Sequence, residues 1–171
     1  MKEQDLQLQM PGGTADAVLF TPDSSLPLPG VVSIPDIGSI RDATRKMARR
    51  LAEEGYVVLM PNPFYRTSRP PVFPFDRKPG VMDERTKLRM NELRAPLTPE
   101  AQEQDMAAYV DFLATQPSVQ PDKLGVVGYC IGGGFALRTA AMRPEKVRAM
   151  ASFHGGGLYK ANDPASPHLV L

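Results

Sequence analysis

The chain opens on a segment in which apolar and polar residues alternate. Leu6-Gln7-Leu8-Gln9-Met10 has an apolar side chain at every second position, which is typical of a strand with one buried face. Pro11-Gly12-Gly13 then turns the chain, and residues 15–20 are predicted to return as the second strand of a hairpin. A proline-rich linker over residues 21–29 follows.

From residue 30 onward, short continuous apolar runs take turns with segments of helical spacing. The runs suit parallel strands that are covered on both faces; they lie at residues 30–34, 56–60, 123–127 and 147–153. The helical segments lie at residues 41–54, 83–93, 99–116 and 135–142, with Thr98 as N-cap of the third and Gly55 as the stop of the first. A long loop rich in proline and aromatic residues fills residues 61–81. This alternation predicts an α/β fold with a mostly parallel sheet and helices on both faces.

Composition and charge narrow the class of protein. The 171 residues predict one domain, residues 1–171, and 42% hydrophobic with 23% charged residues is typical of a globular protein. A net charge of +1 gives no reason to expect nucleic acid or a membrane surface as a partner, and the basic cluster in residues 41–50 fits a solvated helix face. The N-terminus lacks the apolar core of a signal peptide, and no apolar run is long enough for a membrane span. A single cysteine fits a reducing compartment, so a cytoplasmic location is expected. No cofactor and no metal site is predicted.

The most informative motif is Gly128-Tyr129-Cys130-Ile131-Gly132, between a predicted strand and a predicted helix. It matches the nucleophile elbow Gly-x-Ser-x-Gly, with cysteine in place of serine. The turn is strained and crowded, so the positions two before and two after the nucleophile must lack bulky side chains, and both are glycine here. The alternative is a buried, inert cysteine beside a glycine-rich turn, because free cysteine is among the most buried residue types.

Together with this motif, four further blocks resemble the dienelactone hydrolases, the cysteine-nucleophile branch of the α/β-hydrolase fold. The matching blocks are residues 31–38, 41–48, 51–62, 125–134 and 153–158, and the resemblance extends from about residue 15 to residue 168. It implies hydrolysis of a small-molecule ester or lactone, one that could carry a carboxylate, by attack of a cysteine thiolate within a Cys–His–Asp triad.

The resemblance also implies roles for particular residues. Cys130 is the nucleophile, and the backbone N–H groups of Ile37 and Ile131 form the oxyanion hole. Asp36 stands where the family has a glutamate that pairs with the resting thiol; the alternative is a loop aspartate in an Asx turn. Lys87, with Arg85 close by, stands where the family has a basic residue for the substrate carboxylate; the alternative for either is a solvated helix face.

The family pattern breaks near the end of the chain. The triad aspartate and histidine follow later strands, and the sequence stops at Leu171 before either strand, so the fold is expected to lack its last strands and helices. Asp163 and His168 follow Cys130 in the triad order, but they share one short stretch and are not expected to form a triad. His154 is expected to pack rather than to act in catalysis. The strand over residues 147–153 would then lie at a sheet edge, which predicts self-association.

The leading interpretation is a hydrolase whose catalytic machinery is incomplete in this chain. Two other functions compete with this interpretation. One is a non-catalytic ligand-binding or interaction module that keeps the sheet and the pocket loops. The other is a redox sensor built on Cys130, which the absence of a second cysteine weakens. The reactivity of the thiol separates the three functions.

Overall fold

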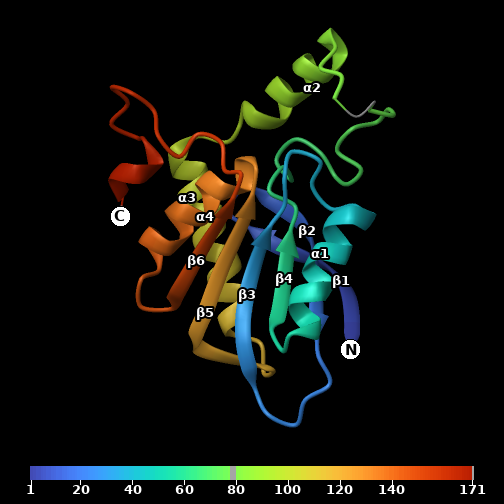
Figure 1. Ribbon diagram of the computed structural model, residues 1–171, viewed down its shortest axis with the longest axis vertical. Coiled ribbons are helices and arrows are strands. Elements are labelled where there is room, and N and C mark those ends of the chain that lie inside the picture. Colours follow the sequence, from blue (N-terminus) through green and yellow to red (C-terminus); the bar gives the residue numbers. More distant parts are fainter. Residues whose placement is uncertain (78–79, 171) are drawn as a thin grey trace.

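The computed structural model describes residues 1–77 and 80–170, and in them a six-stranded sheet is flanked by helices (Figure 1). The strands are β1 (Lys2–Met10), β2 (Gly13–Thr21), β3 (Leu28–Ile34), β4 (Val57–Pro61), β5 (Val119–Tyr129) and β6 (Val147–Phe153). The helices are α1 (Asp42–Glu53), α2 (Glu84–Arg94), α3 (Pro99–Ala114), α4 (Ile131–Met142) and a short 3-10 helix, η1 (Pro167–Val170). The predicted strands and helices are confirmed in type and order.

The sheet has the order β1-β2-β4-β3-β5-β6. The hairpin β1–β2 is antiparallel and β2 runs antiparallel to β4, whereas β3 runs parallel to β4 and β5, and β5 parallel to β6. The prediction of a mostly parallel α/β sheet is therefore confirmed. Within the described residues, β1 and β6 form the two edges.

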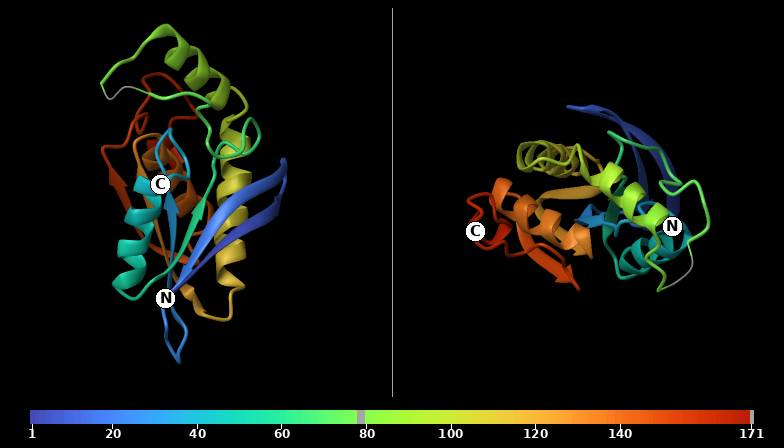
Figure 2. Two further views of the ribbon diagram at one scale, coloured as in Figure 1. Left: turned by 90° about the vertical axis from the view of Figure 1, so that its right-hand side faces the viewer. Right: turned by 90° about the horizontal axis from the view of Figure 1, so that it is seen from above.

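Two apolar cores lie on opposite faces of the sheet, and alternate residues of one strand supply them. Val57 and Leu59 of β4 contact the core that contains residues of α3 and α4. Val58 and Met60 of the same strand contact the core formed with α1. Because successive side chains of a strand point to opposite faces, the unbroken apolar run of β4 requires helices on both sides. Figure 2 shows α1 on one side of the sheet and α3 with α4 on the other.

The strand that leads to Cys130 is longer than predicted. Val119 and Gln120 pair with Leu28 and Pro29, and a bulge between Pro29 and Gly30 separates this pairing from the regular ladder. The polar residues after Gln120 hid this first part of β5, since they interrupt the apolar run on which the prediction rested.

Helix α2 and the loop before it lie above the carboxyl ends of the central strands (Figures 1 and 2). Phe64 and Val72 of the loop are buried, and they pack with Leu93 of α2 and with Ile37. This third apolar cluster fixes α2 over the edge of the sheet where the elbow lies. The predicted N-cap of α3 is confirmed, because the Thr98 hydroxyl accepts a hydrogen bond from the Ala101 N–H at 3.2 Å.

Candidate active site at the Cys130 elbow

Cys130 occupies a sharp turn between the last residue of β5 and the first residue of α4. Its backbone has φ 57° and ψ −118°, a conformation that L residues rarely adopt and that surrounding structure must maintain. The Cys130 N–H donates to the Phe153 carbonyl at 3.1 Å, and its carbonyl accepts from the N–H groups of Gly133 and Gly156, both at 3.0 Å. Strand β6 and the loop after it therefore hold the turn in place.

Glycine is required on both sides of this turn. A Cβ atom on Gly128 would lie 1.9 Å from the Gly132 carbonyl oxygen. One on Gly132 would lie 2.6 Å from the Ile34 carbonyl oxygen and 2.8 Å from that of Pro35. These partners are backbone atoms and cannot move as a flexible side chain does. The crowding predicted for the elbow is confirmed at both glycines.

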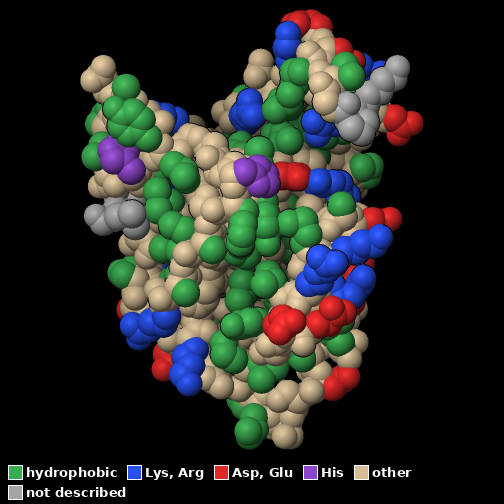
Figure 3. Space-filling view, in the orientation of Figure 1, with side chains coloured by type: hydrophobic (Ala, Val, Ile, Leu, Met, Phe, Trp, Pro, Cys, Tyr) green, Lys and Arg blue, Asp and Glu red, His purple; other side chains and the backbone are tan. Residues whose placement is uncertain are grey.

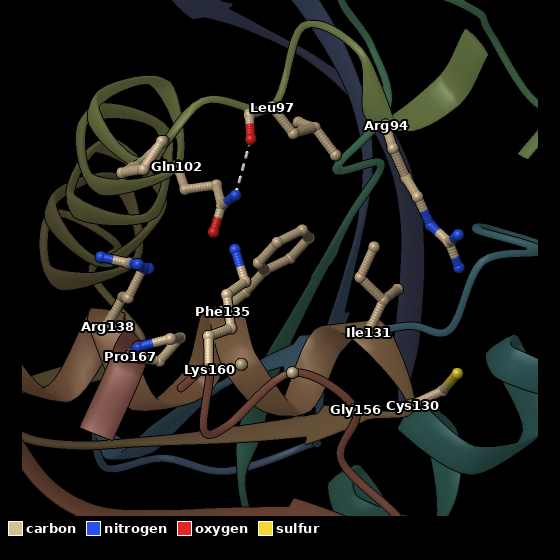
Figure 4. A pocket seen from close by; sticks show the side chains of 13 residues that line it. Arg94, Leu97, Gln102, Cys130, Ile131, Phe135, Arg138, Gly156, Lys160 and Pro167 are labelled. Carbon is tan, nitrogen blue, oxygen red and sulfur yellow. Dashed lines mark hydrogen bonds between the residues drawn. The ribbon is translucent and has the colours of Figure 1, made fainter. Parts of the chain in front are cut away.

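A cavity of about 450 Å³ opens beside the cysteine, which is within the range of small-molecule sites. It lies between α2, α3, α4 and the loop after β6. Its lining comprises Arg94, Leu97, Pro99, Gln102, Cys130, Ile131, Gly134, Phe135, Arg138, Gly156, Gly157, Lys160 and Pro167. Figure 4 shows Cys130 and Arg138 on opposite sides of this cavity. The Cys130 side chain is partly exposed, and within residues 1–77 and 80–170 no hydrogen bond engages its sulfur.

The fold brings the two predicted oxyanion donors into one neighbourhood. The side chain of Ile37, from the loop after β3, is buried in the third apolar cluster, and Ile131 packs against the same cluster. Neither backbone N–H donates a hydrogen bond to any group of the described residues. An oxyanion hole needs free backbone N–H groups, and the oxyanion role of these two residues stays a prediction.

Asp36 does not make the expected contact with the thiol. Its carboxylate accepts two hydrogen bonds from Arg41, each at 2.7 Å, and one from the Gly38 N–H at 2.8 Å. Burial raises the pKa of this carboxyl, but the hydrogen bonds from Arg41 and Gly38 outweigh it, and the pKa lies below its ordinary value. The physical reason is that the planar fork of arginine binds a carboxylate more strongly than a neutral thiol can. The Asx turn that was the alternative is present at Gly38.

Lys87 and Arg85 do not line the cavity, so the structure does not place them where the substrate-binding role requires them. The Lys87 ammonium lies 3.6 Å from the Glu84 carboxylate on the same helix. The Arg85 guanidinium lies 3.9 Å from the centre of the Phe75 ring, a cation–π contact. Both side chains have their partners on the outer side of α2, because packing of Leu93 sets the rotation of this helix.

Three other cations line the cavity, and sequence reasoning missed all three. They are Arg94 at the end of α2, Arg138 in α4 and Lys160 in the loop after β6. Arg138 is buried, which is rare for a charged residue and indicates a paired group. No spacing in the sequence links these three segments, so only the tertiary structure reveals that they share a cavity.

The two histidines lie outside hydrogen-bonding contact with Cys130. His168 contacts the Ser166 hydroxyl through Nδ1 at 2.8 Å, and its ring lies 5.0 Å from that of Tyr159. Asp163 accepts from the Ala165 N–H at 2.8 Å, so it joins neither His168 nor the thiol, as expected. His154 follows β6 and is exposed, and the expectation that it packs is wrong.

Two further features, a metal-binding cluster and a membrane-spanning helix, are absent from the described residues. No group of three or more His, Cys, Asp or Glu side chains in residues 1–77 and 80–170 could hold a metal ion. None of the helices described there is both long and apolar enough to cross a membrane.

A strained strand–turn–helix of the nucleophile-elbow type, at the carboxyl edge of a mostly parallel sheet with helices on both faces, is characteristic of the α/β-hydrolase fold. Within this fold the chain belongs to the dienelactone hydrolase family, whose model matches residues 15–169.

Similar proteins agree with this assignment. A carboxymethylenebutenolidase of Rhodococcus opacus is 32% identical over 139 residues, which is 81% of this chain and 49% of that protein. One from Pseudomonas putida is 26% identical over 94% of this chain and 64% of its own length. The crystal structure of a dienelactone hydrolase from Anabaena variabilis, 21% identical, superposes with a TM-score of 0.64 over 90% of this chain and 63% of that one. This chain thus spans about half to two thirds of the length of its relatives.

Proposed function

We propose that the protein is a hydrolase of the dienelactone hydrolase type and that it cleaves a small ester or lactone through the thiolate of Cys130. The observation that carries the proposal is the backbone of Cys130, with φ 57° between two glycines that tolerate no Cβ atom. A fold maintains such strain where a side chain must be presented for chemistry. Relatives named carboxymethylenebutenolidase support a lactone or ester as the substrate class.

The proposed reaction begins when the sulfur of the thiolate attacks the carbonyl carbon of the substrate. The carbonyl oxygen gains a negative charge, which the N–H groups of Ile37 and Ile131 stabilise. The charge then returns to the carbonyl, the bond to the alkoxy oxygen breaks, and the acyl group remains on Cys130 as a thioester. Water adds to the thioester and releases the acid and the thiol.

The second half of this reaction needs a general base, and neither histidine of the described residues contacts Cys130. General bases contribute about 10²–10⁴-fold in rate. For a protein of residues 1–171 we therefore expect fast transfer of the acyl group to sulfur and slow hydrolysis of the thioester.

The test uses p-nitrophenyl acetate as the ester. We expect a burst of nitrophenolate of up to one equivalent per chain, followed by slow turnover, and mass spectrometry of peptides should find the acetyl group on Cys130. Cys130→Ala is the matched control and should abolish the burst. An acetyl group on another residue, or the same burst in Cys130→Ala, would overturn the proposal.

The competing functions give different results when the protein is treated with p-nitrophenyl acetate and, in a separate reaction, with hydrogen peroxide. A thiol that reacts with peroxide but takes no acetyl group would indicate a redox sensor. A thiol inert to both reagents would indicate a binding module.

We further propose that the chain self-associates through β6. This strand lies at a sheet edge, and its outward side chains Ala149, Ala151 and Phe153 are exposed. Beside them the face of β5 and β6 not covered by α1 forms an apolar groove of about 580 Å³, and Figure 3 shows hydrophobic side chains gathered across this face. A second copy that pairs antiparallel to β6 would satisfy the free backbone groups and cover this surface.

A further inference from the structure

Asn62, the residue after β4, is completely buried, and each of its polar groups has a partner. The backbone N–H donates to the Asp16 carbonyl at 2.8 Å, and the backbone carbonyl accepts from the Tyr109 hydroxyl at 3.2 Å. The side-chain Nδ2 donates to the Ser68 carbonyl at 2.8 Å. Because a carbonyl can only accept, this contact fixes which way the amide points and leaves Oδ1 as the acceptor on its other side.

The Oδ1 atom of Asn62 joins two residues that hold Ile37. It accepts from the Ser39 hydroxyl at 2.7 Å and from the Phe64 N–H at 3.0 Å. Phe64 is buried in the same apolar cluster as the Ile37 side chain. Ser39 closes the turn that contains Ile37, because its N–H donates to the Asp36 carbonyl at 2.9 Å. One oxygen atom therefore fixes both this turn and a side chain that packs in the cluster of Ile37.

The backbone of Ser39 depends on its neighbours. Its φ of 54° lies in the left-handed region, which a residue with a Cβ atom rarely adopts, and such strain persists only where surrounding structure maintains it. Ser39 is fully buried, so its hydroxyl relies on Asn62 rather than on water for an acceptor. The Ser39 carbonyl accepts from the Thr44 hydroxyl at 2.9 Å. These contacts hold the end of the turn in one conformation.

The turn uses two of its N–H groups internally and leaves that of Ile37 free. The Gly38 N–H donates to the Asp36 carboxylate, and the Ser39 N–H donates to the Asp36 carbonyl. The Ile37 N–H has no acceptor within residues 1–77 and 80–170. An oxyanion hole works when its donors are held in advance where the charge will form. The direction of the Ile37 N–H therefore depends on the conformation of the turn.

We propose that Asn62 is a positioning residue for the reaction of Cys130, because it fixes the turn over residues 36–39 through Ser39 and so aims the Ile37 N–H at the carbonyl oxygen of the substrate. The inference rests on the proposed function. Asn62 is not among the residues that line the cavity, so it acts through the turn and not by contact with the substrate. Its effect is confined to the step in which charge develops on oxygen.

The test compares two reactions of the same thiol in Ser39→Ala, which removes only the hydroxyl that donates to Asn62. With p-nitrophenyl acetate, the carbonyl oxygen gains a negative charge as sulfur attacks, and nitrophenolate then leaves. With iodoacetamide, sulfur forms a bond to the methylene carbon as iodide leaves, and no oxyanion develops. The measured quantity is the ratio of the acetylation rate constant to the alkylation rate constant. We expect Ser39→Ala to lower this ratio by about tenfold through acetylation alone, less than the loss of an oxyanion donor outright.

Tyr109→Phe is the matched control. It also removes a buried hydroxyl that donates to Asn62, but the acceptor is the backbone carbonyl instead of Oδ1. Both variants should lower the urea midpoint of unfolding, since each loses one buried hydrogen bond, and only Ser39→Ala should lower the ratio. A ratio unchanged in Ser39→Ala, or lowered equally in both variants, would overturn this inference alone. Absence of the burst in the unmodified protein would instead overturn the proposed function.

A second measurement does not depend on the reactivity of Cys130. Hydrogen exchange of backbone amides reports local opening, and the N–H of residue 39 is protected by its bond to the Asp36 carbonyl. After correction for the intrinsic rate of the new sequence, this protection should fall by about tenfold in Ser39→Ala, as one hydrogen bond is lost, and by less in Tyr109→Phe. Equal protection in the two variants would contradict the role of Asn62 whatever the state of the thiol.

Discussion

The guanidinium of Arg41, at the start of α1, holds the carboxylate of Asp36 by two hydrogen bonds of 2.7 Å. A third hydrogen bond, from the Gly38 N–H, closes the loop around Ile37. The pair therefore fixes the backbone that carries one of the two proposed oxyanion donors. Asp36 was expected to contact the thiol of Cys130. Its observed role is to shape the loop that carries Ile37.

This relationship predicts different effects on two reactions of Cys130. Asp36→Asn should slow acetylation by p-nitrophenyl acetate by about tenfold, less than the 10²–10³-fold cost of removing an oxyanion donor outright. Alkylation by iodoacetamide develops no oxyanion, so its rate and pH dependence should stay unchanged. Arg41→Gln should reproduce both results. A shifted rate–pH curve for alkylation in Asp36→Asn would instead show that the carboxylate acts on the thiol directly.

Gly132, two residues after Cys130, gives a prediction on stability. Gly132→Ala places a methyl group 2.6 Å from the Ile34 carbonyl oxygen, so β3 and α4 must separate. We expect the free energy of unfolding in urea to fall by about 1–3 kcal/mol, the usual cost of overpacking.

Gly134→Ala provides the matched control in the same helix. The nearest atom to its Cβ position is the Gly156 carbonyl oxygen at 3.4 Å, an ordinary contact. Alanine should therefore raise the free energy of unfolding by about 0.5–1 kcal/mol through its helix propensity. Equal losses in the two variants would show that the crowding at Gly132 is not what limits substitution there.

The ion pairs of the Asp111 carboxylate predict how the free energy of unfolding depends on pH. Its carboxylate lies 2.7 Å from Arg143 and 2.6 Å from Lys146, and hydrogen bonds from these two cations lower its pKa from 3.8 to about 2. A depressed pKa stabilises the fold above pH 3.8, and this contribution is lost as the pH falls toward 2. Since the Asp111 side chain is 40% exposed, we expect its ion pairs to contribute about 1 kcal/mol or less to the free energy of unfolding at pH 6.

The measurement is urea unfolding of Asp111→Asn and of the unmodified protein at pH 6 and pH 3. Their difference in unfolding free energy should shrink at the lower pH. Asp122→Asn is the control, because the Asp122 carboxylate pairs with no residue of the described chain. A difference that stays constant between the two pH values would contradict the electrostatic origin.

The fold and the elbow follow from local features of the sequence, whereas the rest of the site does not. The apolar run at residues 56–60 predicts β4, and the glycines at 128 and 132 predict the crowded turn, because both signals act within a few residues. The ion pair of Asp36 and the exclusion of Lys87 from the cavity depend on the rotation of α1 and α2 in the folded molecule. In α2 that rotation is set by Leu93, and the weak segregation of apolar and polar side chains along this helix does not reveal it.

The proposed self-association rests on the contrast between the two edges of the sheet. Strand β1 begins with Lys2, Glu3, Gln4 and Asp5, and charged residues of this kind protect an edge. Strand β6 has one charged residue, Arg148, and exposes apolar side chains at Ala149, Ala151 and Phe153. In an antiparallel pair centred on Met150, Ala151 would face Ala149 of the second copy, and the two Arg148 side chains would lie apart.

We therefore expect a dimer at micromolar concentration in sedimentation velocity. Ala151→Lys places a charge at the centre of the interface and should shift the dimer toward monomer, while Gln4→Lys, at the β1 edge, should leave it intact. A monomeric unmodified protein with a cooperative thermal transition would exclude the dimer. Dissociation by both substitutions would place the interface elsewhere, because a charge on β1 cannot act on a β6 contact at the opposite edge of the sheet.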